Sequence, residues 1–124
     1  MEREIVDIAL ENLKQVIDIQ AQFAFKGPLD GVLKITVNGR KYAYTAEVKR
    51  EVRTYLLPQL EDYAHQHKPF LLVAHRLFPK IREELRQKEI PYLEANGNIF
   101  LKEDGLFLFV DTQKPLEAEK KQGN

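Results

Sequence analysis

The amino-acid sequence predicts a single α/β domain, in which a mixed central sheet is flanked by helices and followed by a C-terminal β-meander. Three features carry this prediction. An Asn-Gly pair at 38–39 separates two alternating segments, which is the strongest short signal for a β-hairpin. The apolar run at 70–74 precedes a proline-led helical segment, as in a buried strand followed by a crossover helix. Two further turn pairs, at 96–97 and 104–105, predict the meander.

Composition limits the classes of function. Lys plus Arg and Asp plus Glu number 19 each, so the formal net charge is zero and a generally basic, nucleic-acid-binding surface is excluded. The absence of cysteine excludes disulfides and thiolate chemistry. The N-terminus is charged and unlike a signal peptide, and no apolar run approaches membrane-spanning length. We therefore expect a cytoplasmic protein that makes no use of the membrane.

The first half of the chain predicts a helix followed by three strands. Apolar residues recur at helical spacing over 3–20, which predicts an amphipathic helix. Residues 22–26 alternate weakly before a Gly-Pro break and indicate a short first strand. The two strands of the hairpin are expected at 31–38 and 40–49.

The second half predicts two helices around the buried strand and then the meander. Pro58 suits a first helical turn, and that helix is expected to end near residue 67. The next helix spans 79–88 and presents a cationic set that is most simply a solvated face, with phosphate contact as the alternative: Lys80, Arg82, Arg86 and Lys88. The strands of the meander are expected at 92–93, 99–101 and 106–110.

The hairpin register brings two acidic residues together. Counting outward from the turn pairs Val37 with Arg40 and places Asp30 opposite Glu47. Opposed Cβ atoms lie roughly 4.5–5.5 Å apart, where like charges are destabilising. There are two structural explanations: the carboxylates are solvated at the strand end, or a bulge moves them apart. The functional explanation is that they hold a divalent cation between them. Lys49 falls on the same face and would stabilise phosphate charge beside such a cation.

Asp30, followed by Glu47-Val48-Lys49 at the end of the next long strand, resembles the PD-(D/E)XK signature of restriction-endonuclease-like nucleases. The proline is displaced by one position, since Pro28 precedes Leu29 and Asp30. The predicted element order also matches the αβββαβ core of that fold. The resemblance implies a catalytic site in which Asp30 and Glu47 bind Mg²⁺ or Mn²⁺ and Lys49 assists phosphodiester hydrolysis.

The helix after this strand extends the resemblance. Gln59 and Tyr63, four residues apart, are similar to a glutamine–tyrosine pair in RecB-family nucleases, which implies contact with nucleic acid. The alternative is that Tyr63 packs at the core edge and Gln59 is a surface residue. Nuclease-like relatives often carry a glutamate on the first helix, but Glu11 points away from the apolar stripe and is expected to be solvated.

A second resemblance involves the meander. Residues 91–99, with the apolar strand and proline-led helix before them, are similar to the N-terminal region of AbiEi-type antitoxins of type IV toxin–antitoxin systems. It covers most of residues 1–112, which we expect to form the PD-(D/E)XK nuclease-like domain. Residues 113–124 are charged and predicted to form a disordered tail. Family members usually carry a winged-helix domain beside such a region, so the chain is either a fragment or acts without one.

Three functions stay open at this stage. The chain is an active Mg²⁺-dependent nuclease, or a non-catalytic antitoxin or regulator module, or a protein-interaction domain without nucleic acid. The second would bind DNA or a cognate partner protein through Lys49, Arg50, Arg53 and the third helix. A homodimer is compatible with each of them.

Overall fold

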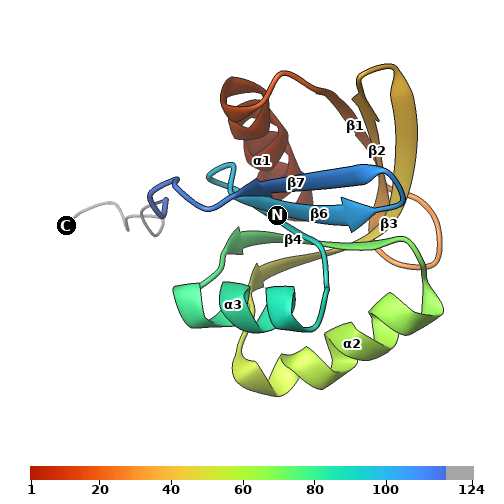
Figure 1. Cartoon of the computed structure of the whole chain (residues 1–124). Coiled ribbons are helices and arrows are strands. Elements are labelled where there is room, and N and C mark those ends of the chain that lie inside the picture. The colour runs from red at the N-terminus through yellow and green to blue at the C-terminus, as the bar shows by residue number, and fades with distance from the viewer. Residues whose placement is uncertain (117–124) are drawn as a thin grey trace.

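The computed structural model describes residues 1–116 and shows one mixed sheet with helices on both faces (Figure 1). The helical elements are α1 (Glu2–Val16), the 3₁₀ turn η1 (Thr54–Leu56), α2 (Leu57–Gln66) and α3 (Pro79–Gln87). The strands are β1 (Gln20–Ala24), β2 (Gly31–Val37), β3 (Arg40–Glu51), β4 (Phe70–Arg76), β5 (Tyr92–Glu94), β6 (Ile99–Glu103) and β7 (Leu106–Val110).

The strand order in the sheet follows the order in the sequence. Strands β1, β2 and β3 are antiparallel neighbours, as are β5, β6 and β7. Strands β3, β4 and β5 run parallel, because α2 and α3 carry the chain back between them. The expectation of an α/β domain with a mixed sheet is therefore confirmed.

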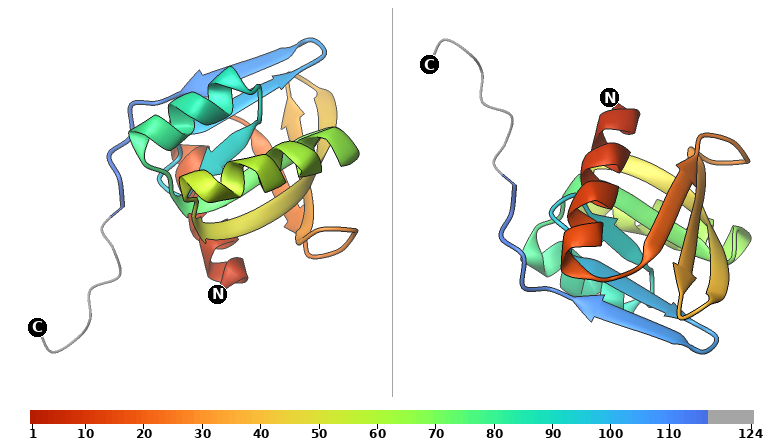
Figure 2. Two further views of the ribbon diagram at one scale, coloured as in Figure 1. Left: turned by 90° about the horizontal axis from the view of Figure 1, so that it is seen from below. Right: turned by 90° about the horizontal axis from the view of Figure 1, so that it is seen from above.

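Each face of the sheet buries its own apolar cluster. On one face α1 contributes Ala9 and Leu13, which pack with strand residues such as Leu33 and Val73. On the other face α2 and α3 cover β4 to β6 (Figure 2), with Leu60 and Leu85 among the buried residues. Burying one such aliphatic side chain contributes about 1.5–3 kcal/mol. The two clusters hold the strands that carry the polar residues described below.

The structure corrects some element boundaries. Helix α1 ends at Val16 rather than near residue 20, because Ile17 is extended with φ −135° and ψ 141°. Strand β1 consequently begins at Gln20 rather than at 22. Strand β3 runs to Glu51 rather than to 49, because its parallel pairing with β4 continues as far as Glu51 opposite Arg76. Within residues 1–116, no helix has the length and apolar character needed to cross a membrane.

The segment after β7 also differs from expectation. The prediction assigned residues 113–116 to a separate tail, yet the backbone N–H of Gln113 donates to Asn98 and Leu116 packs against the α1-side cluster. The domain therefore extends beyond residue 112. The rest of the predicted tail, residues 117–124, lies outside the described residues.

Candidate functional site

The β2–β3 hairpin has the register that its turn predicts. Asn38 and Gly39 adopt φ values of 50° and 79°, the left-handed region that a two-residue turn of this kind requires. Three pairs predicted from the turn are present in the ladder: Val37 with Arg40, Ile35 with Tyr42, and Leu33 with Tyr44. The ladder ends at Gly31 opposite Ala46, one step before Asp30 and Glu47.

Asp30 is fixed across the open end of this hairpin. The backbone N–H of Val48 donates a 2.7 Å hydrogen bond to Asp30 Oδ2. This bond joins the loop before β2 to β3 and keeps the Asp30 carboxylate beside the strand that carries Glu47. The alternative in which a bulge moves the two acidic residues apart is therefore not what the structure shows.

Glu47 and Lys49 lie on the face of β3 that points toward α2. The Glu47 side chain is 12% exposed, and its Oε2 lies 3.3 Å from Lys49 Nζ. Burial raises the pKa of the Glu47 carboxyl, the negative charge of Asp30 raises it further, and the hydrogen bond from Lys49 opposes both. The structure thus brings Asp30, Glu47 and Lys49 together, and the electrostatics favour a proton or a cation at the pair of carboxylates.

The two predicted arginines occupy different places. Arg50 lies with Val48 on the opposite face, where its Nη1 lies 2.8 Å from the sulfur of Met1, the residue before α1. Arg53 lies just after β3 and pairs with Glu51, with 3.2 Å between Nη2 and Oε1. Arg53 is thus at the same strand end as Lys49, whereas Arg50 is directed to the α1 side.

Gln59 and Tyr63 lie on α2, as predicted, but in different environments. Gln59 is exposed to solvent. Tyr63 is half-buried and packs on the α2-side cluster, with its ring centroid 6.3 Å from that of Phe70. The structure places Tyr63 at the core edge, in line with the alternative interpretation, and leaves Gln59 accessible.

The acidic pair offers a small donor set for a metal. Within residues 1–116, no group of three or more His, Cys, Asp or Glu side chains is arranged to hold a metal ion. Glu11 is exposed on α1, on the other side of the sheet, and adds no third carboxylate. Mg²⁺ is nevertheless commonly bound through one or two carboxylates, with water and substrate phosphate completing its shell. Asp30 and Glu47 fit that pattern, because burial and then the charge of Asp30 raise the pKa of Glu47, and a cation between the two carboxylates would relieve their repulsion.

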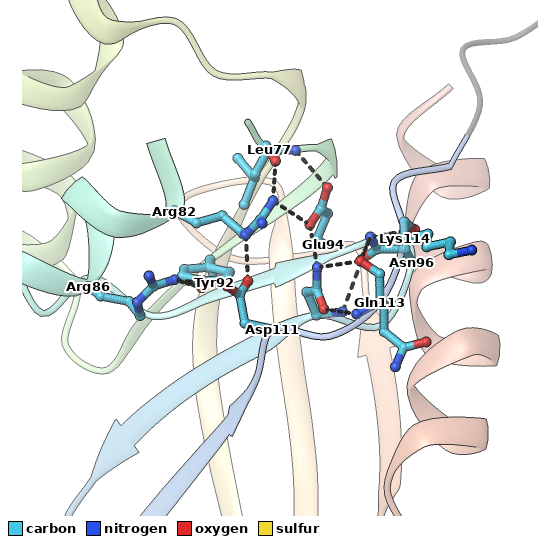
Figure 3. Close-up of polar contacts among 10 residues, drawn as sticks. Leu77, Arg82, Arg86, Tyr92, Glu94, Asn96, Asp111, Gln113 and Lys114 are labelled. Atoms are coloured by element: carbon cyan, nitrogen blue, oxygen red, sulfur yellow. Dashed lines mark hydrogen bonds and ion pairs between the residues drawn. The ribbon is translucent and has the colours of Figure 1, made fainter. Parts of the chain in front are cut away.

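A second, buried polar cluster was not predicted (Figure 3). The Glu94 side chain is fully buried at the end of β5. Its Oε2 accepts a 2.9 Å hydrogen bond from the backbone N–H of Leu77, and its Oε1 accepts from Asn98 Nδ2 at 3.1 Å. Arg82 Nη1 lies 3.5 Å from the same Oε1. Every oxygen of this carboxylate is therefore satisfied by protein donors.

Arg82 corrects the expectation of a solvated cationic face on α3. Its side chain is 10% exposed, and its Nε donates to Asp111 Oδ1 at 2.6 Å. Its Nη1 donates to the backbone carbonyl of Leu77 at 2.6 Å. Arg86 is also engaged, since its Nη1 donates to the Tyr92 hydroxyl at 2.8 Å. The chain leaving β7 covers this side of α3, and helical spacing alone does not reveal such a long-range contact.

The buried cluster is close to the acidic pair but separate from it. The strand register places Ala74 between Lys49 on β3 and Glu94 on β5. Two strand spacings, about 10 Å, therefore separate the backbones that carry Lys49 and Glu94. Polar residues inside the otherwise apolar meander, at 94, 96 and 98, were the sequence signal that could have revealed this cluster.

A comparison of the chain with protein-family models, with curated proteins and with solved structures found no match. The likeness to PD-(D/E)XK nucleases and to AbiEi-type antitoxins therefore remains a prediction, which rests on the residues of this chain alone. The geometry of Asp30, Glu47 and Lys49 is the basis for the function proposed next.

Proposed function

We propose that this chain is a PD-(D/E)XK-type domain that hydrolyses nucleic-acid phosphodiesters, with Asp30 and Glu47 as the ligands of Mg²⁺ or Mn²⁺. The observation that carries the proposal is the pair of carboxylates at the open end of the β2–β3 hairpin, with Lys49 Nζ 3.3 Å from Glu47 Oε2. The order α1, β1 to β3, α2 and β4 is the order that the resemblance implies, and it supports the same proposal.

Each residue has a distinct part in this proposal. A divalent cation, when bound, lowers the pKa of a water molecule and neutralises charge on the phosphate. The Val48 N–H holds Asp30 in place, so this carboxylate is oriented before any ligand enters. Glu47 would hold the cation together with Asp30, in place of its ion pair with Lys49. The Lys49 ammonium is then free to donate to a phosphate oxygen on the same face of β3.

Calorimetric titration with Mn²⁺ tests the ligand assignment. We expect the wild type to bind Mn²⁺ and Asp30→Asn and Glu47→Gln to lose that binding. Glu51→Gln is the matched control, because Glu51 lies on the same strand four residues beyond Glu47 and pairs with Arg53. Equal Mn²⁺ binding by the wild type and Asp30→Asn, or none by the wild type, would refute the assignment. Cleavage of labelled DNA with Mg²⁺ or Mn²⁺ then tests the reaction.

A second candidate is a regulator or antitoxin module that binds DNA or a partner protein without cleaving DNA. Two observations favour it: Lys49 already neutralises Glu47, and the described residues supply no third acidic ligand. Arg53 lies at the same strand end, where its exposed guanidinium pairs with Glu51. DNA binding that weakens with salt and with reversal of Lys49 and Arg53, without cleavage under either metal, would select this function.

A further inference from the structure

Within residues 1–116, no helix covers one face of β1, β2 and the first residues of β3, up to Ala43. Strands β1, β2 and β3 pack α1 against one face, while α2 and α3 lie over β4 to β6 on the other (Figures 1 and 2). On that second face the side chains of Lys34, Lys41 and Ala43 are exposed, whereas β4 is buried over residues 70–74. The uncovered face is continuous with Glu47, because every second residue of β3 points to it.

The part of this uncovered face that lies away from Glu47 is hollowed and carries the positive charges of Lys34 and Lys41. It forms a shallow hollow of about 440 Å³. Its polar lining consists of Gln20, Gln22, Lys34, Thr36 and Lys41. Among residues 1–116, no Asp or Glu lines the hollow, although acidic and basic residues are equal in number in the sequence. Such an excess of positive charge on one concave surface is complementary to a polyanion.

The strand register gives the distance from the hollow to the acidic pair. Lys34 is paired with Ala43, and Thr36 with Lys41. From the level of Ala43 to Glu47 is four residues of one strand, or about 13 Å. Between Ala43 and Glu47, the side chain that β3 presents on this face is the small, half-buried Thr45.

From this arrangement we infer that the open face of β1 to β3 binds the phosphate backbone of a DNA strand through Lys34 and Lys41 and leads it to Asp30 and Glu47. The inference rests on the proposed function, since it supplies the path by which the substrate reaches that site. Lysine ammonium groups contact phosphates as point charges, while the neighbouring glutamines and Thr36 add neutral donors. Contacts to phosphates position a strand but do not distinguish its sequence, so binding is expected to be insensitive to sequence.

Fluorescence anisotropy with labelled single-stranded DNA of about 20 nucleotides tests this surface in buffer with EDTA, which prevents cleavage. The test variant is Lys34→Glu/Lys41→Glu. The matched control is Lys14→Glu/Lys114→Glu, which changes the net charge equally at exposed lysines elsewhere, on α1 and after β7. Melting curves of both variants verify that the fold is retained.

Two lost phosphate contacts should lower the slope of log K against log salt by about 1.4, since each contact to a single strand contributes about 0.7. At 0.1 M salt this corresponds to roughly 25-fold weaker binding if the affinities converge at 1 M. Equal weakening by the two double variants, or no DNA binding by the wild type, overturns the inference. If the two double variants lose DNA affinity equally while the wild type cleaves DNA with metal, the binding surface is refuted and the proposed hydrolysis is supported. If only Lys34→Glu/Lys41→Glu loses DNA affinity and no protein cleaves DNA with metal, the binding surface is supported and the proposed hydrolysis is refuted.

Discussion

The buried carboxylate of Glu94 provides the sharpest test of the structure through Glu94→Gln. The native carboxylate accepts from Leu77, Asn98 and Arg82, all of them donors. A glutamine amide can still accept from one or two of these donors, but its NH₂ group must face another. The variant loses one hydrogen bond to a charged group, which contributes about 1.5–3 kcal/mol to stability. Arg82 also loses its ion pair with Glu94 and keeps the one with Asp111. We therefore expect a loss of about 3 kcal/mol in the free energy of unfolding.

Urea unfolding followed by circular dichroism measures this loss. For a domain of this size, about 3 kcal/mol corresponds to a melting temperature lower by roughly 10–15 °C. Glu83→Gln, at an exposed position of α3, is the control and should change the stability by less than about 0.5 kcal/mol. A cost of Glu94→Gln below about 1 kcal/mol would refute the conclusion that the cluster is closed and satisfied.

Three further predictions follow from the site and the turns. The pKa of Glu47 is raised above 4.5, so the apo protein should lose stability as the pH rises through that raised pKa; melting curves against pH should show this in the wild type and not in Glu47→Gln. Mn²⁺ at about 100 times its dissociation constant should stabilise the wild type by about 2.7 kcal/mol, measured by thermal unfolding, and leave Asp30→Asn unchanged. Gly97 has φ 101° and an added Cβ would lie 2.9 Å from Val16, so Gly97→Ala should cost more in urea unfolding than Gly39→Ala, where φ is 79° and no atom lies within 4 Å. Equal costs at the two glycines would contradict the close packing of the β5–β6 turn on α1.

The local part of the fold could be predicted because short-range chemistry determines it. The Asn38-Gly39 turn fixes the hairpin register up to Gly31 opposite Ala46, and the hydrogen bond from the Val48 N–H then holds Asp30 beside the strand that carries Glu47. The burial of Arg82 could not be predicted in this way. On α3 it lies beside the apolar stripe, and its partner Asp111 comes from the far end of the chain. Contacts between segments so far apart depend on the order of the whole sheet, which a single periodic segment does not contain.

The two buried glutamates differ in how fully the fold satisfies their charges. Glu94 is enclosed by donors from three parts of the chain, so its charge is stabilised and its requirement for partners is met within the fold. Glu47 has Lys49 as a cationic partner but also faces Asp30, which raises its pKa. A fold that only needed stability would gain by replacing one of these two carboxylates with a neutral side chain. The stability given up at Asp30 and Glu47 is therefore the physical reason to look for a cation at that end of the hairpin rather than beside Glu94.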